Sequence, residues 1–388
     1  MSRRMILLVS GQPMPNLLAA LEPELGVSAA HLIVSGDMRA SGQGDRLGDI
    51  LIGRGLRVIW HDVSDPFSPE ATRGLVARLL GEDPKDVIIN VTGGTKPMAL
   101  GAYRAAAEAG VRDILYMEHE TGLLRWLEGN RPPFRAAARL TLAEVISAHG
   151  ASSTPGRAPP EDRLSLARQL GDRLEGGLLE AWNRLMAEVD RQCGRGRRWQ
   201  PSAVPLERAF SASPAAPPCP AEALAEVATT ACAQGLAALA GGHLTISRRE
   251  DHGFLAGGWF EALVWQSLAE ARDMMGLHDI ACNLVVTDAA GAQNEIDLAA
   301  MQGRHLLVFE CKTARLTGRD IREKAGGVLY RLAHLARLGG LGTRLFLVSR
   351  LPLALEVRAR FASGRVEVID GVCPAALPGA LARAIGPA

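Results

Sequence analysis

Residues 295–312, EIDLAAMQGRHLLVFECK, decide the fold of the C-terminal part of this chain. The first part, 295–299, alternates polar with apolar residues, as a half-buried strand does, and a Gln-Gly turn follows it. The second part, 305–312, predicts another strand. Side chains alternate along a strand, so Glu310 and Lys312 share one face. The stretch therefore predicts two adjacent strands, the second of which ends in a charged pair.

The two predicted strands carry the residue types of a phosphodiester-cleaving site. Asp297 and Glu310 supply carboxylate oxygens, which Mg²⁺ and Mn²⁺ prefer as ligands. Lys312 adds an ammonium group that can orient a water or offset charge on a phosphodiester. Glu261, in the first turn of a predicted helix 257–272, is a third acidic candidate, although a carboxylate there also simply stabilises a helix N-terminus. We expect Asp297, Glu310 and Glu261 to hold the metal and to act with Lys312 in catalysis.

Composition places the chain among folded globular proteins. It has 388 residues, of which 47% are hydrophobic and 22% charged, enough for two or three domains. Lys and Arg (43) balance Asp and Glu (42), so contacts with nucleic acid must come from local basic patches. The six cysteines form no CxxC pair, which argues against a zinc site or a disulfide framework and fits a reduced cytoplasm. The apolar run 5–9 is too short for a membrane span, and we expect a cytoplasmic protein without a membrane partner.

Residues 4–127 alternate short apolar runs with amphipathic stretches. Strands are predicted at 5–10, 31–35, 56–61, 87–91 and 113–117, with a possible edge strand at 122–127. Helices are predicted at 16–25, 45–54, 71–80 and 97–109. Near-continuous apolar strands separated by helices are typical of a parallel α/β sheet that is buried on both faces. The pattern predicts a Rossmann-like, doubly wound domain.

A glycine-rich loop, Thr92-Gly93-Gly94-Thr95-Lys96, lies between a predicted strand and a predicted helix. Paired glycines let backbone N–H groups approach an anion, and the helix N-terminus favours negative charge. The loop is neither a Walker loop nor a GxGxxG fingerprint, and the alternative is a plain glycine turn. In a parallel sheet, other strand ends meet at the same edge. Further ligand contacts are therefore expected from Ser10, Gly11, Gln12, Pro13 and Asn16 after the first strand and from Ser35 after the second.

Two segments rich in Pro and Gly or Ser, 151–160 and 211–220, predict linkers or exposed loops, and the leucine spacing of 161–190 predicts a helical connector. From residue 243 onward the pattern is a mixture of strands and helices. A basic stretch follows Lys312 and fits either a phosphate-binding helix or an ordinary exposed helix face. Its members are Arg315, Arg319, Arg322, Lys324, Arg331 and Arg337.

These residues resemble known families. Asp297, Glu310-x-Lys312 and the upstream Glu261 resemble the PD-(D/E)XK nuclease superfamily, and the loop 92–96 resembles that of a CARF domain. Their order resembles the CARF-plus-nuclease ancillary effectors of type III CRISPR systems. The resemblance implies an α/β chain in three parts: a CARF-like sensing domain (1–145), a Pro-rich and helical connector (146–242), and a restriction-endonuclease-like PD-(D/E)XK domain (243–388).

The resemblance also implies an activity. It implies a homodimer whose two CARF domains bind one cyclic oligoadenylate, with cyclic tetra-adenylate the expected ring. The ligand would activate metal-dependent, largely nonspecific cleavage of single-stranded RNA, DNA or both in antiviral defence. Two alternatives stay open: a restriction- or repair-type DNA endonuclease with an ordinary nucleotide-binding domain, and a ligand-responsive binding protein with an inert nuclease-like domain. The intact acidic residues and Lys312 favour an active enzyme.

Overall fold

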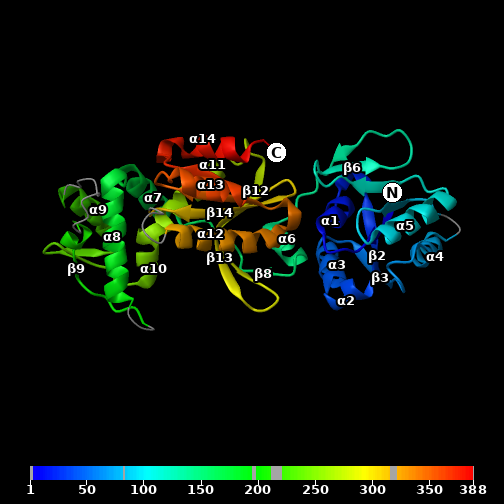
Figure 1. Cartoon of the computed structure of the whole chain (residues 1–388), viewed down its shortest axis with the longest axis horizontal. Helices are drawn as coiled ribbons and strands as arrows, with labels where there is room; N and C mark the ends of the chain where they lie inside the picture. Colours follow the sequence, from blue (N-terminus) through cyan, green and yellow to red (C-terminus); the bar gives the residue numbers. More distant parts are fainter. Residues whose placement is uncertain (1–2, 82–83, 195–197, 211–220, 315–320, 388) are drawn as a thin grey trace.

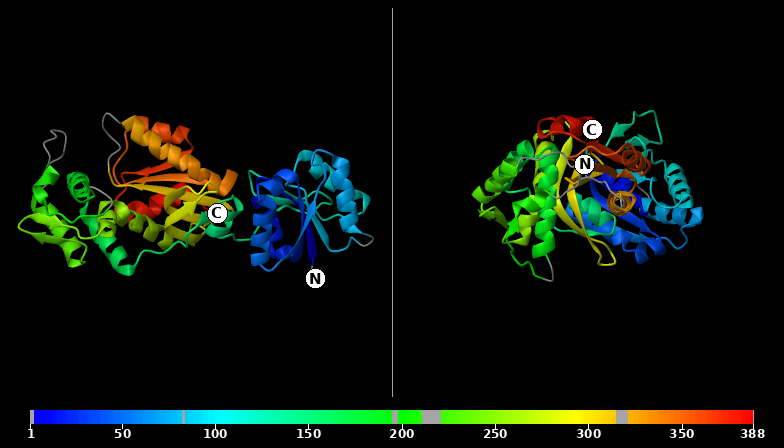
Figure 2. Two further views of the ribbon diagram at one scale, coloured as in Figure 1. Left: turned by 90° about the horizontal axis from the view of Figure 1, so that it is seen from below. Right: turned by 60° about the vertical axis from the view of Figure 1, so that its left-hand side comes forward.

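The computed structural model describes residues 3–81, 84–194, 198–210, 221–314 and 321–387, and the side chains of all of these except 321–324. The molecule is elongated (Figure 1). An N-terminal α/β domain lies at one end, a second α/β domain lies in the middle, and a largely helical part lies at the other end. Figure 2 shows the same succession from two further sides.

The N-terminal domain is built on one seven-stranded sheet in the order β3-β2-β1-β4-β5-β6-β7. Its strands are β1 (Arg3–Leu8), β2 (Val27–Val34), β3 (Arg57–Asp62), β4 (Val87–Asn90), β5 (Ile114–Met117), β6 (Leu123–Trp126) and β7 (Phe134–Arg135). The first five pair in parallel, and β6 and β7 are antiparallel. This order confirms the predicted doubly wound fold. The segment predicted as an edge strand, 122–127, is instead next to last, since the two-residue β7 forms the edge.

Helices cover both faces of this sheet because its central strands are apolar on both sides. Along β1, Met5 and Leu7 face one hydrophobic core, and Ile6 and Leu8 face the other. The first face carries α1 (Met14–Ala20) and α3 (Gln43–Gly53), and the second carries α4 (Pro69–Leu80) and α5 (Lys96–Glu108). The short helices η1 (Pro23–Leu25) and α2 (Gly36–Ala40) follow strand ends or turns, and α6 (Leu142–Ala148) leads into the middle domain. The carboxyl ends of the parallel strands thus share one edge.

The middle domain is built on a six-stranded sheet in the order β16-β15-β14-β13-β12-β8. Its strands are β12 (Leu277–Thr287), β13 (Gln293–Gln302), β14 (His305–Lys312), β15 (Arg344–Ser349), β16 (Val366–Asp370) and β8 (Ser152–Ser153). The pairs from β8 to β14 are antiparallel, and those from β14 to β16 are parallel. One face packs against α6, α12 (Ile321–Leu335) and α13 (Leu355–Ser363), and the other against α11 (Trp259–Glu270) and α14 (Leu377–Ile385).

The segment between the two sheets is more than a connector. Its helices α7 (Glu161–Arg173), α8 (Gly176–Cys193) and α9 (Ala221–Ala233) share one hydrophobic core with α11. A small sheet of β9 (Val204–Pro205), β10 (Ala238–Ala240) and β11 (His243–Thr245) closes this end of the molecule. Of the two predicted linkers, 151–160 contains β8, an edge strand of the middle sheet, and 211–220 lies outside the described residues.

Short elements complete the chain. The helix α10 (Arg249–Gly253) and the π-helix η3 (Phe254–Gly258) run directly into α11. The 3₁₀ segments η2 (Leu206–Phe210), η4 (Ala336–Gly342) and η5 (Pro374–Ala376) follow β9, α12 and β16. Within the part of the chain described here, no helix is both long and apolar enough to cross a membrane.

Candidate active site and ligand loop

Asp297 lies where strands β13 and β14 separate. Their regular pairing ends at Leu298 and Phe309, beyond which the backbone of β14 needs another partner on that side. The Asp297 carboxylate provides it by accepting a hydrogen bond from the backbone N–H of Cys311 at 2.8 Å. This bond fixes the carboxylate beside the end of β14, as the two-strand prediction requires.

Glu310 is buried, with only 1% of its surface exposed, and is held between two cations. Lys312, on the same face of β14, and Arg331, from α12, both pair with its Oε1 atom. Lys312 also donates to the backbone oxygen of Cys311 at 3.2 Å. A buried carboxylate is stable only when it is paired in this way. The prediction found Glu310 and Lys312 but gave Arg331 only as one member of a basic stretch.

Glu261 comes to the same place from the first turn of α11. Burial raises the pKa of Glu261 to about 8, and the negative charges of Asp297 and Glu295 add to the rise, while Lys312 and Arg331 oppose it. Carboxylates raise each other's pKa only when they lie close together. The structure therefore gathers Glu261, Asp297, Glu310 and Lys312 at one end of the sheet, and exposed Glu295 lies near them.

A cavity of about 850 Å³ opens beside Glu261 and Glu295. On one side it is lined by α10 and the π-helix, which includes Phe254. On the other it is lined by Pro155, Arg157 and the prolines that follow, which belong to the segment predicted as a linker. This wall could not be predicted, because breaker residues indicate a loop but do not indicate what packs beside it.

The oxygen-rich donor set fits a hard divalent cation. Burial and then the charges of Asp297 and Glu295 raise the pKa of Glu261, and a cation bound between these groups would oppose the rise. Among the residues that the structure describes, however, no three acidic, His or Cys side chains already converge as ligands of one ion. Glu310 is engaged by Lys312 and Arg331 instead.

The side chains of the predicted ligand loop in the N-terminal domain divide into two groups. Asn16, Thr92 and Thr95 bond within the chain. Asn16 is fully buried; it donates to the Leu8 oxygen at 2.8 Å and accepts from Asn90 at 3.0 Å. The Thr92 hydroxyl donates to Asn90 at 2.6 Å and accepts from the Met117 N–H at 2.7 Å.

Two further predicted contacts act as helix caps. Thr95 caps α5 by accepting from the Met98 N–H at 3.2 Å, and it also donates to the Pro66 oxygen. Ser35 caps α2 by accepting from the Met38 N–H at 3.4 Å. These bonds stabilise the conformation of the loops, so other residues form the surface that can contact a ligand.

The remaining predicted contacts form the surface at the strand ends. Lys96, at the start of α5, is exposed, as are Gly11 and Gln12, while Ser10 and Gly94 are half-buried and Pro13 is buried. Gly93 permits a close approach, since a Cβ there would lie 2.0 Å from the Leu8 backbone oxygen. Backbone groups, Lys96 and Gln12 are thus the parts of this edge that can meet a ligand.

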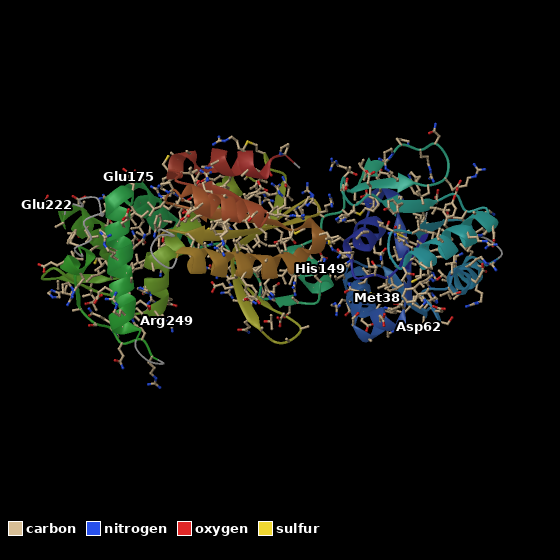
Figure 3. The ribbon with its side chains drawn as sticks, in the orientation of Figure 1. Met38, Asp62, His149, Glu175, Glu222 and Arg249 are labelled. Atoms are coloured by element: carbon tan, nitrogen blue, oxygen red, sulfur yellow. The ribbon has the colours of Figure 1, made fainter. Side chains whose placement is uncertain are left out.

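Gln12 also reaches the middle domain. A Cβ placed on Gly340 of η4 would lie 3.0 Å from the Gln12 Oε1 atom and 2.6 Å from the His149 Nε2 atom. Figure 3 labels His149 at the junction of the two domains. Gly340 adopts a φ of 63°, which favours glycine. The loop after β1, which carries Gln12, is therefore in contact with η4, which directly follows the helix that carries Arg331.

Two family models match the chain. The Card1 CARF domain matches residues 5–145, and the Card1-like endonuclease domain matches residues 248–370. The chain joins a Card1-type CARF domain to a Card1-like endonuclease domain. The matches cover the CARF loop and all four residues gathered at the end of the endonuclease sheet. No curated protein matches.

Solved structures share the whole architecture of the CARF and endonuclease domains. Protein VC1899 of Vibrio cholerae is 22% identical, with a TM-score of 0.77 over 99% of this chain and 97% of that one. Can2 of Sulfobacillus thermosulfidooxidans, solved with cyclic tetra-adenylate, is 18% identical, with a TM-score of 0.74 over 100% of both chains. A type III CRISPR defence DNA nuclease activated by cyclic oligoadenylate is 20% identical, with a TM-score of 0.59 over 99% of this chain and 52% of that one.

The basic stretch of the endonuclease domain is described only in part. Arg315 and Arg319 lie outside the described residues, as do the side chains of Arg322 and Lys324. Arg337 is exposed, whereas Arg331 is turned toward Glu310. Neither interpretation of the stretch accounts for Arg331, because its partner is a buried carboxylate of the same domain.

Proposed function

We propose that the chain is a cyclic-oligoadenylate-activated, metal-dependent nuclease of single-stranded RNA, DNA or both that acts in type III CRISPR antiviral defence. The observation that carries the proposal is the meeting of Glu261, Asp297, Glu310 and Lys312 at one end of the endonuclease sheet. The bound ligand in the Can2 structure supports cyclic tetra-adenylate as the activator.

The four residues have different roles in phosphodiester hydrolysis. Glu261, Asp297 and Glu310 are the groups that would hold Mg²⁺ or Mn²⁺. When bound, the ion supplies an activated water and offsets charge on the phosphate. Lys312 stands beside Glu310 and is placed to stabilise negative charge that develops on the phosphodiester. Glu261 must lose its proton to bind a cation, so its raised pKa couples metal binding to proton release.

Arg331 gives the site an inactive arrangement. It pairs with the Oε1 atom of Glu310 and keeps that oxygen from a metal ion for as long as the pair lasts. Arg331 belongs to α12, and η4, which touches Gln12 of the loop after β1, follows that helix. A ligand that moves the loop would thereby move the helix that controls Glu310. Such coupling requires that the ligand prefer the active arrangement to the resting one.

The start of α5 supports a homodimer. Leu100, one turn after Lys96, is 64% exposed, and Phe67 is 72% exposed. Phe67 adjoins Pro66, whose oxygen accepts from the Thr95 cap, so both apolar side chains lie at the same end of α5. An apolar surface beside the ligand loop suits a two-fold interface across which two copies share one symmetric ring. We expect Leu100→Glu to yield a monomer in light scattering, and an unchanged dimer would contradict this interface.

The deciding experiment is a cleavage assay. Labelled single-stranded RNA, single-stranded DNA and supercoiled plasmid are incubated with Mn²⁺, with and without cyclic tetra-adenylate. The wild-type chain is compared with Glu310→Ala and with Glu356→Ala, which removes an exposed glutamate of α13 as a matched control.

Each outcome of this assay has a distinct meaning. Ligand-dependent cleavage that is lost only in Glu310→Ala supports the proposal and identifies the substrate. Cleavage at the same rate without the ligand would contradict activation and favour the restriction or repair alternative. Ligand binding without cleavage by the wild-type chain would favour the inert binding protein.

A further inference from the structure

We propose that residues 154–160, which we call the strap, form the wall of a groove for single-stranded nucleic acid, and that Arg157 binds the substrate backbone through a phosphate. The inference rests on the proposed function and adds to it a residue and a surface that bind the substrate strand. Arg157 acts by positioning the strand and is not one of the four residues at the end of the sheet.

The backbone of the strap is fastened to the edge of the endonuclease sheet. The Thr154 N–H donates to the Val285 oxygen at 2.9 Å, and the Cys282 thiol donates to the Arg157 oxygen at 2.9 Å. Gly156 lies against β12 so closely that a Cβ there would be 2.2 Å from the Cβ of Ala281. These contacts hold the strap at a fixed distance from the sheet and make it a rigid wall.

Arg157 is the arginine of this cavity whose charge no acidic side chain of the described residues pairs with. The cavity is also lined by Arg163 and Arg248, but both pair with Asp251, at 2.8 and 2.7 Å, and Arg248 pairs with Glu250 as well, at 2.9 Å. The exposed guanidinium of Arg157 makes no ion pair or hydrogen bond to the described part of the chain. It therefore offers an uncompensated positive charge in the same cavity as Glu261.

The residues that line the cavity indicate which class of ligand it binds. The exposed carboxylate of Glu295 lines the cavity and repels a phosphate backbone unless a cation holds that backbone, and Arg157 provides such a cation in the same cavity. The ring of Phe254 lines the cavity as well, with the Arg163 guanidinium 4.9 Å from its centre. An aromatic ring beside arginines is a stacking platform for unpaired bases. Bases within a duplex are already stacked, so the surface favours a single strand.

Binding can be measured apart from catalysis. A fluorescent 12-nucleotide single-stranded DNA and the matching RNA are titrated in EDTA, at several salt concentrations, with the full-length wild-type chain and its variants. We expect Arg157→Ala to weaken binding about 10-fold and to reduce the slope of log affinity against log salt by about 0.7, the value of one phosphate contact on a single strand. Arg157→Lys keeps the charge and should keep the slope. Arg208→Ala removes an exposed arginine of η2, outside the cavity, and should change neither.

A second variant tests the strap without touching its charge. Gly156→Ala pushes the strap away from Ala281, and we expect it to weaken binding while the salt slope stays the same, because Arg157 remains. An Arg157→Ala chain with the wild-type slope would overturn the assignment of Arg157. A duplex that binds as tightly as the single strands would overturn the strand class. If the wild-type chain binds single strands through Arg157 but no metal ion supports cleavage, this inference stands and the proposed function fails.

Discussion

In the CARF domain, the amide and hydroxyl groups at the strand ends bond to their own chain, whereas in the endonuclease domain carboxylates from different elements gather at the end of the sheet. Asn16 and Thr92 each donate and accept a hydrogen bond within their own domain, and so stabilise a loop. Burial, and then the nearby charge of Asp297, raises the pKa of Glu261. Polar and charged residues near strand ends thus stabilise a loop in one domain and form the candidate active site in the other.

The difference follows from what burial does to each group. A neutral amide or hydroxyl is readily satisfied by a nearby backbone group, and the local chain supplies several. A carboxylate needs a cation or several donors before burial is tolerated. Unsatisfied charge therefore marks the chemical site more reliably than polarity alone.

The largest effect is expected at Asp297. Asp297→Asn keeps an acceptor for the Cys311 N–H but removes a charge from the metal site, so cleavage should fall at least about 100-fold with the fold intact. Single-turnover cleavage in Mn²⁺ measures the loss, and circular dichroism checks the fold. Unchanged cleavage would place the chemistry elsewhere.

Lys96 should control affinity for the ligand. Lys96→Ala removes the exposed cation of the loop, and we expect binding of cyclic tetra-adenylate to weaken about 10- to 100-fold, since a charged contact to phosphate is worth about 1.5 to 3 kcal/mol. Calorimetric titration gives the affinity. The exposed Lys96 should leave the melting temperature unchanged, and the idea fails if affinity stays the same.

Asn16 should show the opposite behaviour. Asn16→Ala removes the side-chain donor to the Leu8 oxygen and one of the two acceptors of the Asn90 amide in the core, which should lower the free energy of unfolding by about 1 to 3 kcal/mol. Urea denaturation measures it. Any loss of ligand affinity should follow the loss of stability. A stable Asn16→Ala protein that no longer binds ligand would show that Asn16 contacts the ligand directly.

The smallest effect concerns Glu261 and pH. Its pKa is raised to about 8, so the folded chain keeps a proton that the unfolded chain loses at the ordinary glutamate pKa. Stability without metal should therefore fall as pH rises through that window. Glu261→Gln lacks this titration. At pH 8 it should therefore be more stable relative to wild type than it is at pH 5. Thermal melts at both pH values, with EDTA, test this, and a difference independent of pH would contradict it.

The sequence predicted the parallel sheet, both domains and the residues at the end of β14, because these depend on local periodicity and on charged residues at strand ends. It could not predict Arg331 opposite Glu310, since that contact depends on how α12 packs on the sheet. The strap was predicted as a linker because proline excludes regular structure but does not reveal what lies beside it. Asn16 was predicted as a ligand contact, and its bonds across to β4 could not be read from spacing alone.

The strap also has a thermodynamic consequence. It follows α6, which leaves the CARF domain, and it lines the cavity that holds Glu261, so one stretch of backbone connects the two binding events. If the activator shifts the strap, linkage requires that a bound strand change the affinity for the activator by the same factor. A nuclease built in this way would hold its signal more tightly while substrate is abundant and release it as the substrate is consumed.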